Sequence, residues 1–303
     1  MACLLPTKTA RHLTFLSILI VMMALASTGR ADEEKAKAAY NTGVTAMQDG
    51  DLLAAEIAFK AAFQFDDSYA DAYLNLGVIY FGQKDYDKAL DMFENASEKD
   101  PTNVDAFANL GRVQSALKKY VEAEESFKAA IALNDSDSEL HKGLGKVYYR
   151  KKSYQDVVQS MLKCHELGAG DNLTYYMLGK SYQKLSKSSD AVAAFKKSLD
   201  LKSNYYSAHF ALGQIYLGQE KFKSAASAFK AAEKADPKKA YRASYNYAVA
   251  VESSNPDATE TNIVNWERYI KLAKNVPKAK SNLAVAQAHV KELKDRKDQE
   301  SLQ

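Results

Sequence analysis

His141, His209 and Cys164 are the residues of this chain with the clearest capacity for chemistry. A metal site would need further His, Cys, Asp or Glu side chains at ligand spacing, and neither histidine has such a set of neighbours. The sequence also lacks a nucleophile elbow, a phosphate-binding loop and a dinucleotide-binding glycine motif. We therefore predict no enzymatic activity, no metal and no cofactor. We expect the histidines to pack in the core or at the edge of a groove. We expect Cys164 to be a buried thiol, with a mixed-disulfide partner or a redox site as the alternative.

The N-terminus has the order of a secretory signal. Lys8 and Arg11 precede an apolar run over residues 13–26, and small residues follow. The run is shorter than the roughly 20 residues that span a bilayer. We predict a signal peptide over residues 1–31, cleaved after Ala31 or after Ala26. An uncleaved anchor is the alternative. The prediction places the protein outside the cytoplasm, in a bacterial periplasm or cell envelope, with no stable membrane span after cleavage.

Removal of the signal changes the charge balance. The whole chain has 41 basic and 38 acidic residues, and residues 1–31 hold three of the basic ones and no acid. The mature chain is therefore formally neutral, which gives no support for a nucleic acid as partner. Cys164 is the one cysteine left after cleavage, so an intramolecular disulfide is excluded and the stability must come from packing.

A glycine recurs at intervals of 34 residues throughout most of the chain. Leucine precedes it in five of six copies, and phenylalanine follows 16 positions later in five of six. We expect the glycine on the first helix of a hairpin to let the second helix, which carries the phenylalanine, approach closely. Gly50 falls instead in an exposed link, so we expect Gly111→Leu to disrupt the array far more than Gly50→Leu. The recurring glycines are Gly43, Gly77, Gly111, Gly145, Gly179 and Gly213.

This period, with Leu-Gly, Tyr, Ala and Phe at fixed positions, resembles the tetratricopeptide repeat. The resemblance implies an all-α fold, a right-handed α-solenoid of tandem helical hairpins with a C-terminal capping helix. A degenerate seventh repeat is expected over 240–276, and a capping helix of about 278–295 with a frayed, charged tail within 277–303. The six repeats of residues 36–239 are expected at about 36–69, 70–103, 104–137, 138–171, 172–205 and 206–239.

In this family the first helices line a concave groove in which partners bind. The resemblance therefore implies that residues at the inward positions form a partner-binding groove. Three asparagines match a family position that can bond a peptide backbone, and basic residues gather in the middle copies beside two tyrosines. We predict a protein or peptide as partner, and we expect the basic stretch to bind an acidic segment, a carboxylate or an anionic polymer, with mere solvation of the charges as the alternative. The candidates are Asn41, Asn75, Asn109, Arg112, Lys142, Lys146, Tyr149, Arg150, Tyr176, Lys180 and Lys184.

The expected function is that of a non-catalytic scaffold for protein–protein interaction. By analogy with the family, it would serve a cell-envelope, secretion or polysaccharide-export assembly. The alternative is a self-assembling structural array in which the groove takes the C-terminal helix of another copy.

Overall fold

The computed structural model describes residues 31–301, which are helical throughout apart from turns and short links. Residues 1–30 of the predicted signal peptide lie outside this range. The chain divides into two compact units, and the boundary between them falls between Val147 and Tyr148, within one helix. Among residues 31–301, no helix combines the length and the apolar character needed to cross a membrane.

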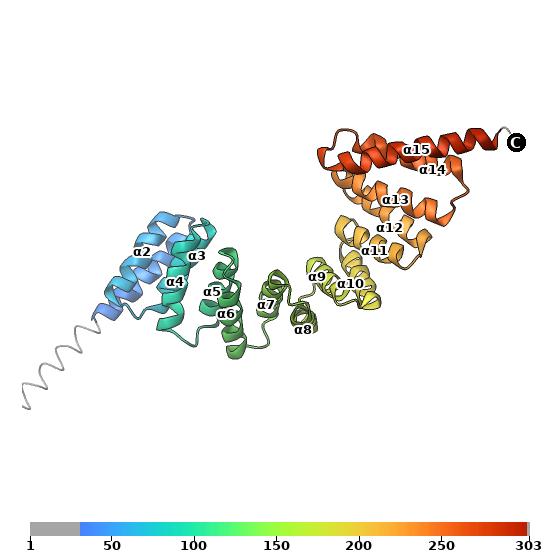
Figure 1. Ribbon diagram of the computed structural model, residues 1–303. Coiled ribbons are helices and arrows are strands. Elements are labelled where there is room, and N and C mark those ends of the chain that lie inside the picture. The colour runs from blue at the N-terminus through green and yellow to red at the C-terminus, as the bar shows by residue number, and fades with distance from the viewer. Residues whose placement is uncertain (1–30, 302–303) are drawn as a thin grey trace, which may run out of the picture. The chain divides into compact units, whose positions relative to one another are not determined.

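The first unit begins, within the described range, with helical residues 31–48. Five further helices follow and alternate between the first and second positions of successive hairpins (Figure 1). They are α2 (Leu52–Phe65), α3 (Ala70–Gly82), α4 (Tyr86–Lys99), α5 (Val104–Ala116) and α6 (Tyr120–Leu133), before α7 (Ser138–Lys151) crosses into the second unit.

The second unit continues the same alternation and ends in a longer helix. Two short 3-10 turns, η1 (Pro237–Lys239) and η2 (Pro277–Ala279), lead into α13 and α15. The helices are α8 (Tyr154–Glu166), α9 (Asn172–Lys184), α10 (Ser188–Leu201), α11 (Tyr206–Gly218), α12 (Phe222–Ala235), α13 (Ala240–Ser254), α14 (Thr259–Ala273) and α15 (Lys280–Glu300).

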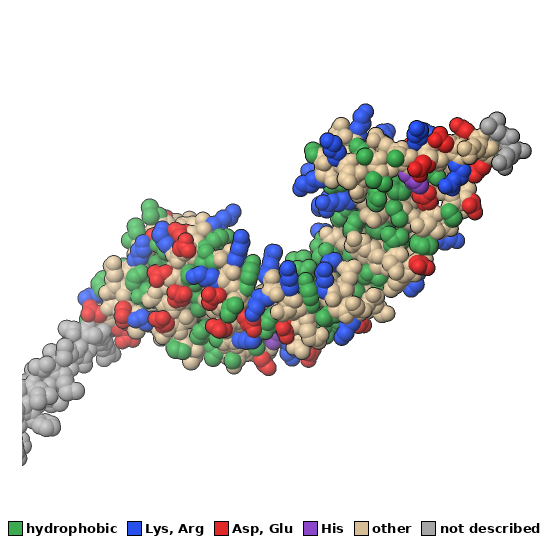
Figure 2. All heavy atoms as spheres, viewed as in Figure 1, with side chains coloured by type: hydrophobic (Ala, Val, Ile, Leu, Met, Phe, Trp, Pro, Cys, Tyr) green, Lys and Arg blue, Asp and Glu red, His purple; other side chains and the backbone are tan. Residues whose placement is uncertain are grey.

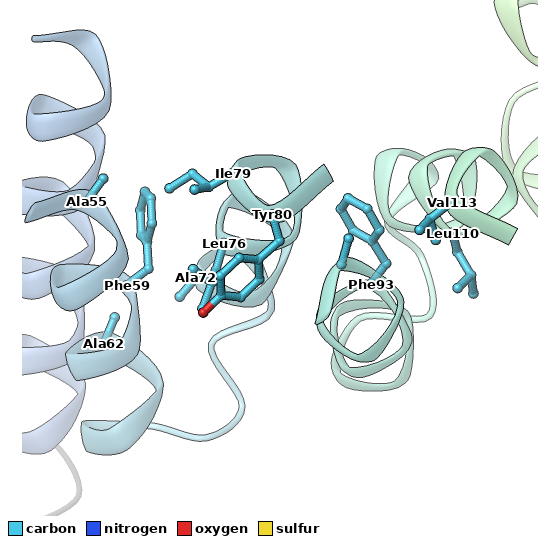
Figure 3. Close-up of a cluster of buried hydrophobic side chains, with 11 residues drawn as sticks. Ala55, Phe59, Ala62, Ala72, Leu76, Ile79, Tyr80, Phe93, Leu110 and Val113 are labelled. Carbon is cyan, nitrogen blue, oxygen red and sulfur yellow. The ribbon is translucent and has the colours of Figure 1, made fainter. Parts of the chain in front are cut away.

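The recurring glycines lie against the phenylalanine rings of their own hairpins. A Cβ atom placed on Gly77 would lie 2.6 Å from the ring of Phe93, which is 1% exposed. The corresponding distances are 2.6 Å from Gly43 to Phe59 and 2.8 Å from Gly111 to Phe127. The same holds for Gly179 with Phe195 and for Gly213 with Phe229. These five contacts confirm the expected role of the glycine, and Figure 3 shows Phe59 and Phe93 within the resulting core.

One phenylalanine is enclosed by glycine on two sides. A Cβ on Gly143 of α7 would lie 2.5 Å from the ring of Phe127, on the ring edge away from Gly111. Gly143 stands two positions before the recurring glycine, where other copies have asparagine, methionine or alanine. The ring therefore touches the first helix of its own hairpin and that of the next one.

The turn inside each hairpin needs a left-handed residue at a fixed position. Gly50 has a φ of +79°, and the residues at the same position in the next five copies also have positive φ. They are Lys84 (65°), Lys118 (64°), Lys152 (62°), Ser186 (60°) and Glu220 (57°). An added Cβ at Gly50 would meet open space, whereas one at Gly111 would lie 2.8 Å from Phe127, so the expected order of the two sites stays a prediction. The positive φ at Gly50 adds a strain for L-residues that the sequence did not reveal.

The C-terminal helix α15 is attached to α13 and α14 by polar as well as apolar contacts. Glu252 of α13 accepts hydrogen bonds from Trp266 Nε1 at 2.8 Å and lies 2.9 Å from His289 Nε2. Leu293 is fully buried. The charged end was expected to fray after residue 295, but α15 continues to Glu300. Lys294 pairs with Glu267, and Lys297 pairs with Glu260, so the charges hold the helix end against α14.

The glycine–phenylalanine contact can be tested within a single helix. Gly77→Ala should destabilise the protein by about 1–2 kcal/mol, because overpacking against a fully buried ring exceeds the gain in helix propensity. Gly82→Ala, five residues later in α3, should be neutral or stabilising, because nothing lies within 4 Å of the added methyl group. Urea unfolding measures both variants, and equal unfolding midpoints would contradict the contact.

Candidate functional site

Charge is segregated between the first and second helices of the central hairpins. The first helices α7 and α9 together carry six basic residues and one acid, Glu139. The second helices of the same two hairpins, α8 and α10, carry four acids and three lysines. Figure 2 shows basic side chains along one edge of the molecule in the region of α5 and α7. The excess of positive charge therefore belongs to the helices that were predicted to meet a partner.

The predicted basic residues of the first unit differ in their exposure and in their polar partners. Arg112 is exposed and donates from Nη1 to Asn109 Oδ1 at 3.0 Å. Lys142 pairs with Glu139 at 3.1 Å, and its side chain is only 17% exposed. Lys146 is exposed. Arg112 and Lys146 therefore present charge to solvent, whereas the charge of Lys142 is already offset within its own helix.

The three predicted asparagines do not form one uniform row. Asn75 donates from Nδ2 to the hydroxyl of Tyr40 at 3.1 Å, a bond that joins the first helices of two hairpins. Asn109 accepts from Arg112. Asn41 is exposed. A peptide that bonded to Asn75 would have to compete with Tyr40, so the asparagine position serves packing between hairpins in at least one copy.

In the second unit, the predicted tyrosines are half-buried rather than projecting. Tyr176 lies 5.6 Å from the ring centroid of Phe195 and 5.3 Å from that of Tyr205. Burial raises the pKa of Tyr176 to about 12. Tyr149 meets Tyr154 edge-on at 6.3 Å, and burial also raises the pKa of Tyr149. Both rings therefore pack against neighbouring aromatic side chains and remain partly exposed.

Lys180 lies on the same face of α9 as Tyr176, one helical turn later. Its Nζ donates to Gln183 Oε1 at 2.7 Å. Partial burial, and then the nearby charge of Lys184, lower the pKa of Lys180. Lys184 and Arg150 are exposed. Partial burial and the charge of Lys184 both disfavour the charged form of Lys180. A bound anion would stabilise that charged form, so these surroundings favour the approach of an anion.

The two histidines have matching structural roles. His141 Nε2 lies 2.9 Å from the carbonyl oxygen of Asp135, and His209 Nε2 lies 2.8 Å from that of Ser203. Each therefore secures the turn that leads into its own helix.

Cys164 is fully buried, as expected. Residues 31–301 contain no cluster of three or more His, Cys, Asp or Glu side chains that could hold a metal ion.

Sequence reasoning did not find a pocket of about 290 Å³ in the second unit. It lies between α11, α13, α14 and the turn η2, and its walls include Phe210, Tyr241, Tyr245, Arg242 and Lys278. The available signal was the aromatic run at 241–247, which contains three tyrosines at close spacing. The spacing alone does not reveal that η2 and α15 close the other side.

Comparisons with known proteins agree with this architecture. Two tetratricopeptide repeat family models match the chain, one over residues 80–147 and the other over residues 176–240 and 210–258. A comparison with curated protein sequences finds no match.

Several solved structures have a similar fold. The pilF protein of Pseudomonas aeruginosa is 20% identical with a TM-score of 0.59, over 74% of this chain and 98% of that chain. YrrB, described as a TPR protein with an unusual peptide-binding site, is 22% identical with a TM-score of 0.55, over 66% and 97%. MamA from Desulfovibrio magneticus is 20% identical with a TM-score of 0.52, over 56% and 96%. At these identities the likeness is one of fold.

The burial of the tyrosines predicts a loss of stability at alkaline pH. Tyr176 and Tyr206 both have a pKa of about 12, against about 10 for an exposed tyrosine. Between these values the unfolded chain releases phenolic protons that the folded chain keeps, so stability falls as pH rises. Spectrophotometric titration of tyrosinate should show a late-ionising fraction that shrinks in Tyr176→Phe. An unchanged late fraction in that variant would contradict the assignment.

Proposed function

Because the chain belongs to the tetratricopeptide repeat family, we propose that it is an exported, non-catalytic scaffold that binds an acidic segment of a partner protein. The fold is that of a family of protein–protein interaction scaffolds. The partner's acidic character and the site of action in the cell envelope are the specific content of the proposal.

The observation that carries the proposal is the charge segregation of the central hairpins. The mature chain is formally neutral, so it has no general attraction for acidic molecules. α7 and α9 each carry an excess of basic residues, which creates an attraction for acidic molecules locally on each helix. Neighbouring charges on one helix, such as Lys146 and Arg150 on α7, add their fields at the surface of that helix. An acidic segment therefore gains most on one of these first helices.

The half-buried rings beside the charges add a second type of contact. Tyr176 and Lys180 stand one turn apart on α9, and Tyr176 is held in place by Phe195 and Tyr205. A ring that is already ordered loses little further entropy when a partner packs on it. An acidic segment with apolar side chains would therefore fit this face better than a purely polar one.

The self-assembling alternative receives less support from the contacts of α15. In this chain α15 buries Leu293, Val290 and Ala286 against its own neighbours. It also forms ion pairs with α14 through Lys294 and Lys297. A helix donated to another copy would have to break these contacts first, so we propose a different protein as the partner.

The proposed location in the cell envelope rests on the order of charged, apolar and small residues before Asp32. We propose that the protein acts there within a secretion or polysaccharide-export assembly. N-terminal sequencing of the protein from an envelope fraction should give a chain that begins at Asp32. A chain that retains Met1 or part of the apolar run would be an anchored protein instead.

The acidic partner can be tested by charge reversal. The variant Arg112→Glu, Lys146→Glu, Lys180→Glu should bind its partner roughly tenfold more weakly at low salt. Its remaining binding should depend less on the salt concentration. Pull-down from the native extract with quantitative mass spectrometry measures both effects, after circular dichroism shows unchanged helicity.

A matched control reverses three exposed lysines on second helices, Lys196→Glu, Lys197→Glu and Lys223→Glu, with the same change in net charge. This control should keep the partners and their salt response. Equal losses in both variants would mean that net charge alone matters, and unchanged binding in the first variant would place the partner elsewhere.

A further inference from the structure

The pocket in the second unit has aromatic walls that are fixed from behind. Tyr245 meets Trp266 edge-on at 5.3 Å and Tyr269 at 5.1 Å. Phe210 stacks on Tyr206 at 5.6 Å and meets Phe229 at 5.5 Å. These contacts hold the rings in one orientation, so the pocket is present before any ligand arrives. A preformed apolar wall lowers the entropic cost of binding.

Two basic side chains stand at the same pocket. Arg242 donates from Nε to the hydroxyl of Tyr241 at 3.1 Å, and its guanidinium carbon lies 5.9 Å from the centroid of that ring. This contact orients the guanidinium and leaves its terminal nitrogens for another acceptor. Lys278 comes from η2 on the opposite side and is exposed. Figure 2 shows basic side chains gathered where α15 begins.

The residues that line the pocket supply no carboxylate to these charges. Among the described residues that line it, none is acidic. Elsewhere in the chain, lysines commonly pair with an acid three or four positions away, as Lys60 does with Glu56 and Lys239 with Asp236. The pocket therefore combines apolar walls with positive charge, and it lacks the negative group that would complete an ion pair.

The remaining polar groups suit a peptide backbone. Asn246 donates to the carbonyl oxygen of Arg242 at 2.9 Å, which leaves its amide oxygen as an acceptor. Asn282 lines the same pocket from the first turn of α15. An amide side chain offers both a donor and an acceptor, as a peptide group does. A volume of about 290 Å³ suits one or two side chains rather than a large cofactor.

We propose that this pocket binds an extended peptide segment in which an aromatic side chain stands next to an acidic one. The aromatic ring packs between Phe210 and Tyr245, and the carboxylate pairs with Arg242 and Lys278. A simple anion would make no use of the apolar walls, and a neutral aromatic ligand would leave the two cations without a partner. This segment resembles that of the proposed function in being acidic with an apolar neighbour, but the pocket lies outside α7 and α9 and is a separate site.

Three short blocked peptides test the two halves of the proposed ligand. The probe is dye-labelled Gly-Phe-Glu-Glu-Gly, and its matched peptides are Gly-Phe-Gln-Gln-Gly and Gly-Ala-Glu-Glu-Gly. Fluorescence anisotropy should give saturable binding of the probe below about 1 mM and at least roughly tenfold weaker binding of both others. Trp266, the single tryptophan of the chain, contacts Tyr245, so its own emission reports occupancy at the pocket.

The variants separate this pocket from the rest of the surface. Arg242→Gln with Lys278→Gln should weaken the probe about tenfold. The control, Lys274→Gln with Lys280→Gln, removes two exposed charges nearby that do not line the pocket and should bind normally. The charge-reversed Arg112, Lys146 and Lys180 variant should also bind the probe normally. Its failure in pull-down would then concern the proposed function alone.

Four results would overturn the inference. The first three are equal binding of all three peptides, unchanged binding in the Arg242 and Lys278 variant, and no saturable binding of the probe up to about 5 mM. Equal weakening in the two lysine-containing double variants would also overturn it, because general charge rather than the pocket would then bind the probe.

Discussion

The close contact between a glycine and a phenylalanine ring is the constraint on which this structure depends. A glycine inside a helix costs about 1 kcal/mol relative to alanine. A fully buried phenylalanine returns about 1.5–3 kcal/mol. The exchange is favourable only if the ring fills the space that the missing Cβ leaves, as Phe93 does against Gly77. Five hairpins repeat this contact, so the spacing of their two helices is set by the same pair of residues.

That contact also decides which side chains reach a partner. Successive residues on a helix are rotated by about 100°, so the residue after the glycine turns away from the ring. Arg112 and Lys146 occupy this position and are exposed. The residue three before the glycine turns toward the ring instead. Tyr40, Tyr176 and Phe210 lie 5.7, 5.6 and 5.5 Å from their phenylalanines. The same glycine–phenylalanine contact therefore places exposed charges and packed aromatic rings on one helix.

The C-terminal hairpin departs from this rule and gains different chemistry. Trp266 takes the place of the phenylalanine, and Glu252 joins it to His289 of α15. After this hairpin come η2 and α15 rather than another repeat. The pocket with Arg242 and Lys278 lies at this change, where regular packing of small and large residues ends.

By itself, the sequence determined the features that depend on neighbours at a fixed period. These are the helical hairpins, the glycine–phenylalanine contacts and the exposed cations, because one short pattern repeated every 34 residues encodes contacts between adjacent helices. Only the tertiary structure decided the rest. Lys118 adopts positive φ because the hairpin requires it, against its own preference. Asn75 is engaged by Tyr40, and Lys297 holds the charged end of α15 through Glu260, 37 residues away. Such contacts depend on where separate helices meet in space, which residue type and spacing do not specify.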